Sequence, residues 1–229
     1  MSKTTIPTGG ITADAINGTL IADDAINSEH YTDGSIDTAH IGDSQVTSAK
    51  TSGVGGLVAL GQVDSGGNVG EVTLDNKFSS TYTNYLVIVD KMTPASNGAN
   101  ILFRFRDDTP STISTSNYGL VSRAYRANDN GLSSRSGDAQ NTFQLTDAGV
   151  SNNSARLGFK MVMWVQNPFT STVYTATHGT FQYQNNSGYS TGGYFQMQLH
   201  ENSSPRGVRM YASTGNINGR IKIYGVVDS

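Results

Sequence analysis

Side chains able to do acid–base or nucleophilic chemistry are few in this chain. It holds four His, no Cys, and no GxSxG, P-loop or HExxH motif. Asp107-Asp108-Thr109-Pro110 is the best acidic pair for splitting a glycosidic bond, which requires two carboxylates held about 5–10 Å apart. Asp in such a turn-like context usually caps or bends the backbone, so we favour a turn over a cation site or a catalytic pair. We therefore expect no enzyme and no cofactor.

Two histidines lie ten residues apart near the N-terminus, His30 and His40. If three chains shared one axis, each position would form a ring of three imidazoles, an arrangement that binds divalent metals. The alternative is that both side chains face solvent or cap a bend. The sequence leaves a metal here open and makes these two residues its only candidates.

A polar, Gly-rich stretch at 183–194 carries three Tyr side chains. Aromatic planes and amide groups suit the apolar and hydroxyl faces of a sugar ring, although the same residues are common in plain hairpin loops. Its candidates for receptor contact are Tyr183, Asn185, Asn186, Tyr189 and Tyr194. Arg123, Arg126 and Arg135 flank another expected loop, 127–134, and suit a partner-docking rim.

The elements that must position these residues begin with an apolar residue at every fifth position of the first fifty residues. The series is Ile11, Ile16, Ile21, Ile26, Tyr31, Ile36, Ile41 and Val46. A period of five fits neither a strand nor a helix, so the chain must bend between short extended pieces. Forty residues are too few for a stable single-chain solenoid. We expect residues 1–50 to form a trimeric stem or anchor in which these side chains meet; the alternative is an acidic, disordered tail.

This run also carries a resemblance. The words IADDAI, SEHYTDGSID and AHIGDSQVTSAK resemble repeats near the ends of fibre and tail-appendage proteins of tailed bacteriophages, particularly marine ones. The ending GNINGRIKIYGV resembles, more weakly, the close of C-terminal domains in phage structural proteins. The resemblance implies a virion structural component that is usually trimeric.

Beyond a Gly-rich hinge at 51–56, residues 57–229 change to short apolar or alternating runs separated by turns. About ten expected strands predict an all-β domain, a β-sandwich that is jelly-roll-like. The run LGFKMVMWV indicates a central strand, with Trp164 as a core anchor. In the last strand, Ile221 and Ile223 are expected to face one side, opposite Arg220, Lys222 and Tyr224.

Composition excludes several classes of protein. The net charge of −3 argues against a nucleic-acid partner, and no apolar run is long enough to insert in a membrane.

We expect a homotrimeric tail fibre or appendage in the virion, assembled in the host cytoplasm. Residues 1–50 would dock on other virion proteins, and the β-domain would contact a host surface glycan or a neighbouring protein. The alternatives are a capsid head fibre or decoration protein, a tail adaptor and, remotely, a glycan-degrading enzyme.

Overall fold

The computed structural model divides the chain into two compact units, Met1–Ser52 and Gly53–Ser229. It describes residues 6–7, 9–13, 15–17, 19–22, 25–42, 45–46, 50, 56–107, 112–113, 116–129, 131–156 and 158–227. Most of the predicted hinge (51–55) and most of the predicted acidic turn (108–110) lie outside these residues. No helix in the described part of the chain is long and apolar enough to cross a membrane.

The described residues of the first unit include a short 3-10 helix, η1 (Ser28–His30), and a series of hydrogen bonds with a five-residue period. Each joins a backbone N–H to the carbonyl three residues earlier, the separation that closes a β-turn. The series runs from Gly10 to Pro7, Ala15 to Thr12, Leu20 to Asn17, Ala25 to Ala22, His30 to Asn27, Ser35 to Thr32, His40 to Asp37 and Gln45 to Gly42. The residue after each of these four-residue spans is one of the eight apolar residues spaced five apart.

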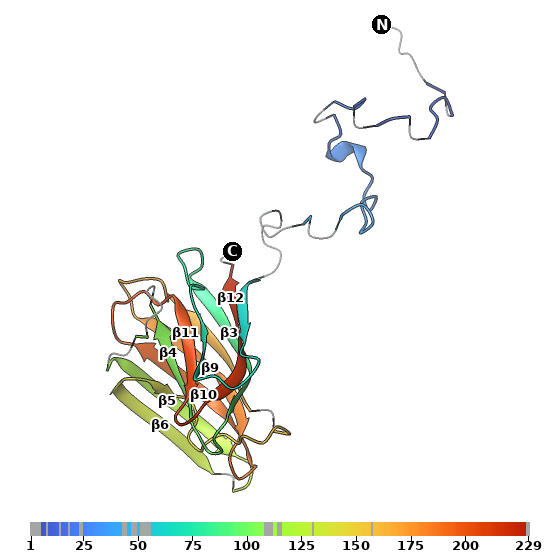
Figure 1. The fold of residues 1–229 in the computed structure, drawn as a ribbon. Helices are drawn as coiled ribbons and strands as arrows, with labels where there is room; N and C mark the ends of the chain where they lie inside the picture. The colour runs from blue at the N-terminus through green and yellow to red at the C-terminus, as the bar shows by residue number, and fades with distance from the viewer. Residues whose placement is uncertain are drawn as a thin grey trace. The chain divides into compact units, whose positions relative to one another are not determined.

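The second unit is all-β, as the sequence predicts (Figure 1). Its described residues form twelve strands. They are β1 (Leu57–Asp64), β2 (Glu71–Leu74), β3 (Asn84–Pro94), β4 (Ile101–Arg106), β5 (Tyr118–Arg126), β6 (Leu132–Gln140), β7 (Phe143–Gln144), β8 (Phe159–Gln166), β9 (Thr175–Gln184), β10 (Ser190–Leu199), β11 (Gly207–Ala212) and β12 (Ile217–Val226). One antiparallel sheet has the order β1-β12-β3-β8-β9-β10-β5-β6, and the other β2-β11-β4-β7. The first sheet is thus twice as wide as the second.

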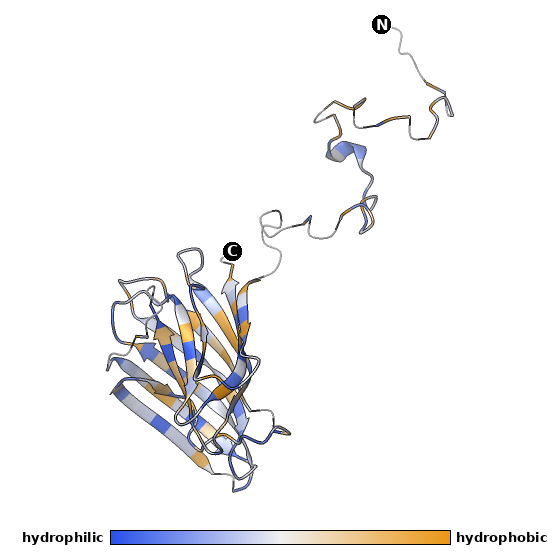
Figure 2. Cartoon of the chain, viewed as in Figure 1, coloured by the Kyte–Doolittle hydropathy of each residue, from blue (hydrophilic) through white to orange (hydrophobic). Residues whose placement is uncertain are grey.

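The core follows from alternation along these strands (Figure 2). In β12, Ile221 and Ile223 are buried while Arg220, Lys222 and Tyr224 are partly exposed, as predicted. The inward side chains of both sheets, including eight Phe and Tyr rings with almost no exposed surface, belong to a single buried cluster. The two sheets therefore enclose one core.

The expectation that Trp164 anchors the core is wrong. In β8 the buried residues are Phe159, Met161, Met163 and Val165, and Trp164 keeps 38% of its surface exposed on the opposite face. A strand that is apolar on both faces hides its period of two, so the continuous run LGFKMVMWV gave no indication of which residues face outward.

Two segments expected as loops are partly strands. The end of the expected loop 127–134 belongs to β6, which pairs with β5 at the edge of the wide sheet. The stretch 183–194 contains the end of β9, a turn at 185–189 and the start of β10. The sequence did not predict β6, because an edge strand with few buried residues lacks the alternation of apolar and polar residues by which strands are recognised.

Gly179 allows close contact between β9 and β8. A Cβ atom built there would overlap the carbonyl oxygen of Val162, which is main chain and cannot move without separating the strands. We expect Gly179→Ala to lower the free energy of unfolding by about 1–3 kcal/mol. Gly70→Ala is the control, because a Cβ there meets nothing within 4 Å. Thermal denaturation that leaves both variants equally stable would contradict this account.

Candidate functional site

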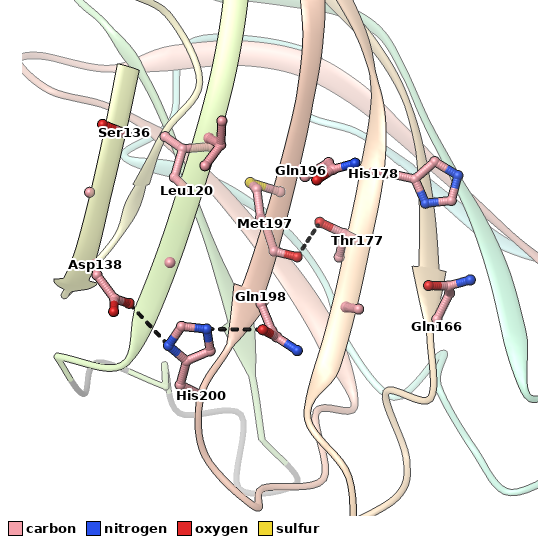
Figure 3. Close-up of a pocket in the computed structure, with 14 residues that line it drawn as sticks. Leu120, Ser136, Asp138, Gln166, Thr177, His178, Gln196, Met197, Gln198 and His200 are labelled. Carbon is pink, nitrogen blue, oxygen red and sulfur yellow. Dashed lines mark hydrogen bonds and ion pairs between the residues drawn. The ribbon is translucent and has the colours of Figure 1, made fainter. Parts of the chain in front are cut away.

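The outer face of the wide sheet contains a groove of about 640 Å³ formed by β5, β6, β8, β9 and β10 (Figure 3). We call it the amide groove, because three of the polar side chains that line it are glutamines. Its outward-facing residues are Gly119, Val121, Ser136, Asp138, Gln166, Ala176, His178, Gln196, Gln198 and His200. No described Lys or Arg lines it.

Strand register explains why these side chains gather. His178 on β9 lies opposite Trp164 on β8 and Gln196 on β10, and the row continues through Val121 and Ser136. Since side chains alternate, the neighbouring residues Thr177 and Met197 are buried beneath. There the Thr177 hydroxyl donates to the Met197 carbonyl oxygen at 3.4 Å.

His200 is fixed by partners on both ring nitrogens. Its Nδ1 lies 3.0 Å from Asp138 Oδ1 on the edge strand β6, and its Nε2 lies 3.0 Å from Gln198 Oε1 (Figure 3). Gly119 makes room for the ring, because a Cβ there would lie 2.8 Å from His200 Cε1. An imidazolium donates to both oxygens. A neutral ring donates to one of them, and its other nitrogen accepts a hydrogen bond only if the Gln198 amide turns its NH2 group toward the ring. The pair is largely exposed, so it fixes the side chain's orientation more than it stabilises the fold.

The groove suits hydrogen bonding to a hydroxyl-rich ligand. Amide groups both donate and accept hydrogen bonds, and an imidazole nitrogen donates or accepts according to its protonation. These side chains can therefore pair with a hydroxyl group that acts as donor or as acceptor. Trp164, next in the row, adds an exposed aromatic surface for an apolar face of the same ligand. None of the amide-groove residues was among the sequence candidates. The alternation in Gln196-Met197-Gln198-Leu199-His200 is the signal that could have found three of them.

The predicted receptor-contact residues do not form one surface. Tyr183 is buried and its hydroxyl accepts from the Ala148 N–H at 3.2 Å; burial raises the pKa of this hydroxyl. Asn185 is buried too, and its Oδ1 accepts from the N–H groups of Ser187 (3.1 Å) and Tyr189 (2.9 Å). Asn185 therefore holds the β9–β10 turn in place, and Tyr183 joins the end of β9 to the backbone at Ala148. Asn186, Tyr189 and Tyr194 are exposed, and for them surface contact stays a prediction.

The two candidate metal ligands close turns in the first unit. His30 Nδ1 accepts from the Asn27 N–H at 3.2 Å, and His40 Nδ1 lies 3.4 Å from the Asp37 nitrogen and 2.7 Å from its Oδ1. Within the described residues of this single chain, no group of three or more His, Cys, Asp or Glu side chains could hold a metal ion. A ring built from three copies stays a prediction.

Comparison with protein-family models, with curated proteins and with solved structures finds no match to this chain.

Tyr118 anchors the strand that carries Gly119 and Val121 into the groove. Its buried hydroxyl donates to the Ile113 carbonyl at 2.7 Å and accepts from the Phe105 N–H at 3.2 Å. We expect Tyr118→Phe to lower the free energy of unfolding by about 1–3 kcal/mol, because it leaves both backbone groups unsatisfied. Tyr194→Phe, on the exposed face, should change it by less than about 0.5 kcal/mol.

The same hydroxyl gives an alkaline pH dependence. Burial raises the pKa of Tyr118 well above its ordinary value of 10.0. The neutral form is thus favoured in the folded state, so this contribution to stability is complete below pH 10 and is lost as the pH rises above it. Urea unfolding between neutral pH and pH 11 should therefore show a shallower decline in Tyr118→Phe than in the parent chain. Equal slopes would contradict the assignment.

Proposed function

We propose that this chain is a non-enzymatic virion structural protein, a short trimeric tail fibre or appendage. Residues 1–50 dock it on the particle and join three copies, and the β-domain contacts the host surface or a neighbouring virion protein. The observation that carries the proposal is the series of eight apolar side chains described above, which are all 36–56% exposed in the single chain.

The single chain leaves these eight apolar side chains exposed, so their burial requires another surface. Each of the eight apolar residues follows a hydrogen-bonded turn, so the turns space them evenly along the segment. Scattered exposed apolar residues are ordinary, but a regular row of them marks an interaction surface. Three copies around one axis would each give a side chain to the same layer, and the resemblance to phage fibre repeats points the same way.

We propose further that the β-domain is a jelly roll enlarged by two hairpins. If the hairpins β5–β6 and β9–β10 are set aside, the remaining strands form two sheets of four, β1-β12-β3-β8 and β2-β11-β4-β7. Numbered afresh along the chain, these orders read 1-8-3-6 and 2-7-4-5, the pattern of two interleaved Greek keys. This strand order supports the assignment.

The amide groove is the contact surface that we assign to the β-domain. A shallow groove lined mainly by uncharged polar groups binds a hydroxylated ligand weakly, and three copies on one particle raise the overall affinity by multivalency. The β5–β6 and β9–β10 hairpins supply most of its residues, so the enlargement of the sheet and the site would have arisen together.

The oligomeric state tests the repeat directly. We expect the full chain to sediment as a trimer and residues 56–229 to sediment as a folded monomer. Ile26→Ser should raise the trimer dissociation constant by at least about tenfold, because it removes an apolar contact from every copy. Leu20→Ser is the matched control: Leu20 is the more exposed of the two at 64%, but it lies outside the five-residue series.

Sedimentation of the full chain as a monomer, or equal effects of the two serine variants, would overturn the stem. Docking is tested separately by complementation of particles with the fragment 56–229. The fragment should be missing from purified particles, and its incorporation at full occupancy would show that residues 1–50 are not the anchor.

A further inference from the structure

A second groove, of about 670 Å³, lies on the same outer face of the wide sheet. We call it the cationic groove, since Arg126, Arg156 and Lys160 all line it. One cross-strand row of the groove runs from Lys160 through Gln182 and Gly192 to Tyr125. Among the described residues that line this groove there is no Asp or Glu.

The three cations are unequally engaged. Arg156 Nη1 donates to Ser151 Oγ at 3.0 Å and to the Asn185 carbonyl at 3.4 Å, which fixes the guanidinium through one nitrogen. Neither Arg156 nor Lys160 forms an ion pair within the described part of the chain. Arg126 lies 3.4 Å from Asp129, a partly exposed contact that leaves most of its charge available.

This contrasts with two arginines of the narrow sheet, Arg106 and Arg209. Arg106 Nε lies 2.5 Å from Asp75 Oδ1, and Arg209 Nε lies 2.5 Å from Glu71 Oε2. Those cations are neutralised by carboxylates of β2 and the residue after it. The cationic groove instead concentrates positive charge beside an open, side-chain-free position at Gly192 and the exposed ring of Tyr125.

The two grooves form one track along the strands. His178 on β9 and Gln196 on β10 line the amide groove; four residues further along each strand, Gln182 and Gly192 line the cationic groove. Four residues of a strand span about 13 Å. The row between them contains Thr180 and Tyr194, and Tyr194 lies opposite Arg123. A ligand that fills both grooves must therefore be extended and must carry groups of two kinds.

We propose that the outer face of the wide sheet binds an acidic, hydroxylated polymer of the host surface, with its hydroxyl groups in the amide groove and an anionic group in the cationic groove. The proposal rests on the proposed function, in which the β-domain contacts the host surface. Guanidinium groups pair with carboxylate or phosphate oxygens through two hydrogen bonds, and the lysine adds a point charge. Both kinds of anion occur on hydroxylated polymers, so the test separates them.

The experiment measures binding of the full chain by calorimetry to three probes: polygalacturonate, its fully methyl-esterified form, and poly(glycerol phosphate). We expect binding of the polymer whose anion the cationic groove prefers, polygalacturonate for a carboxylate or poly(glycerol phosphate) for a phosphate. The affinity should fall as the salt concentration rises to about 0.15 M. The methyl ester should bind at least about fivefold more weakly than polygalacturonate if the anion is a carboxylate.

Variants locate the site. Lys160→Gln should weaken binding of the preferred acidic polymer by at least about fivefold, whereas Lys91→Gln, which removes an exposed charge from β3, should change it by less than about twofold.

Gln196→Ala should weaken binding of a long oligomer of that polymer but not of its two-unit fragment, because only the long chain reaches the amide groove.

Three results would each overturn the inference. The first is equal binding of polygalacturonate and its ester without binding of poly(glycerol phosphate). The others are equal losses in the two lysine variants and preference for a single-stranded DNA of matched charge. A trimer that binds none of the acidic polymers refutes this inference alone. A monomer that binds them refutes the proposed trimer and leaves the groove assignment standing.

Discussion

One constraint organises the β-domain: every residue that a strand sends into the core is followed by one that it sends to the opposite face. The wide sheet has eight strands and its partner four, and their inward side chains share one buried cluster. The outer face of the wide sheet therefore lies away from this cluster. Its side chains include His178, His200, the three groove glutamines and Lys160.

The same constraint explains what the sequence could and could not predict. Strands with one buried and one polar face, such as β12, are read correctly down to the facing of Ile221 and Lys222. β8 is apolar on both faces, so its existence was predicted but the exposure of Trp164 was not. β6 is polar on both faces and was missed. The grooves depend on which strands are neighbours, as in the pairing of His178 with Gln196, and local pattern does not contain that information.

The proposed jelly roll gives these grooves a structural origin. β5–β6 and β9–β10 lie side by side beyond β8 and extend only one of the two sheets. Their inner faces still add to the core, through Phe181, Phe195 and Leu120 among others. Adding two hairpins thus costs little packing and creates a new outer surface. Their edge is closed by the polar strand β6, which suits an edge that must not pair with other chains.

In the proposed function, the two units would solve different parts of one physical problem. An open groove with few ligand contacts cannot exclude water well, so its charged and polar groups would bind with modest affinity. Attachment would then require several copies held together, and the regular apolar series would hold them. The period of five is significant for this proposal: each turn makes its backbone hydrogen bond within the chain, so contacts between copies would be left to the apolar side chains. Assembly would depend on burial of apolar surface, which salt does not screen, whereas recognition would depend on charge, which salt does screen. A change of ionic strength should therefore release the ligand while leaving the trimer intact.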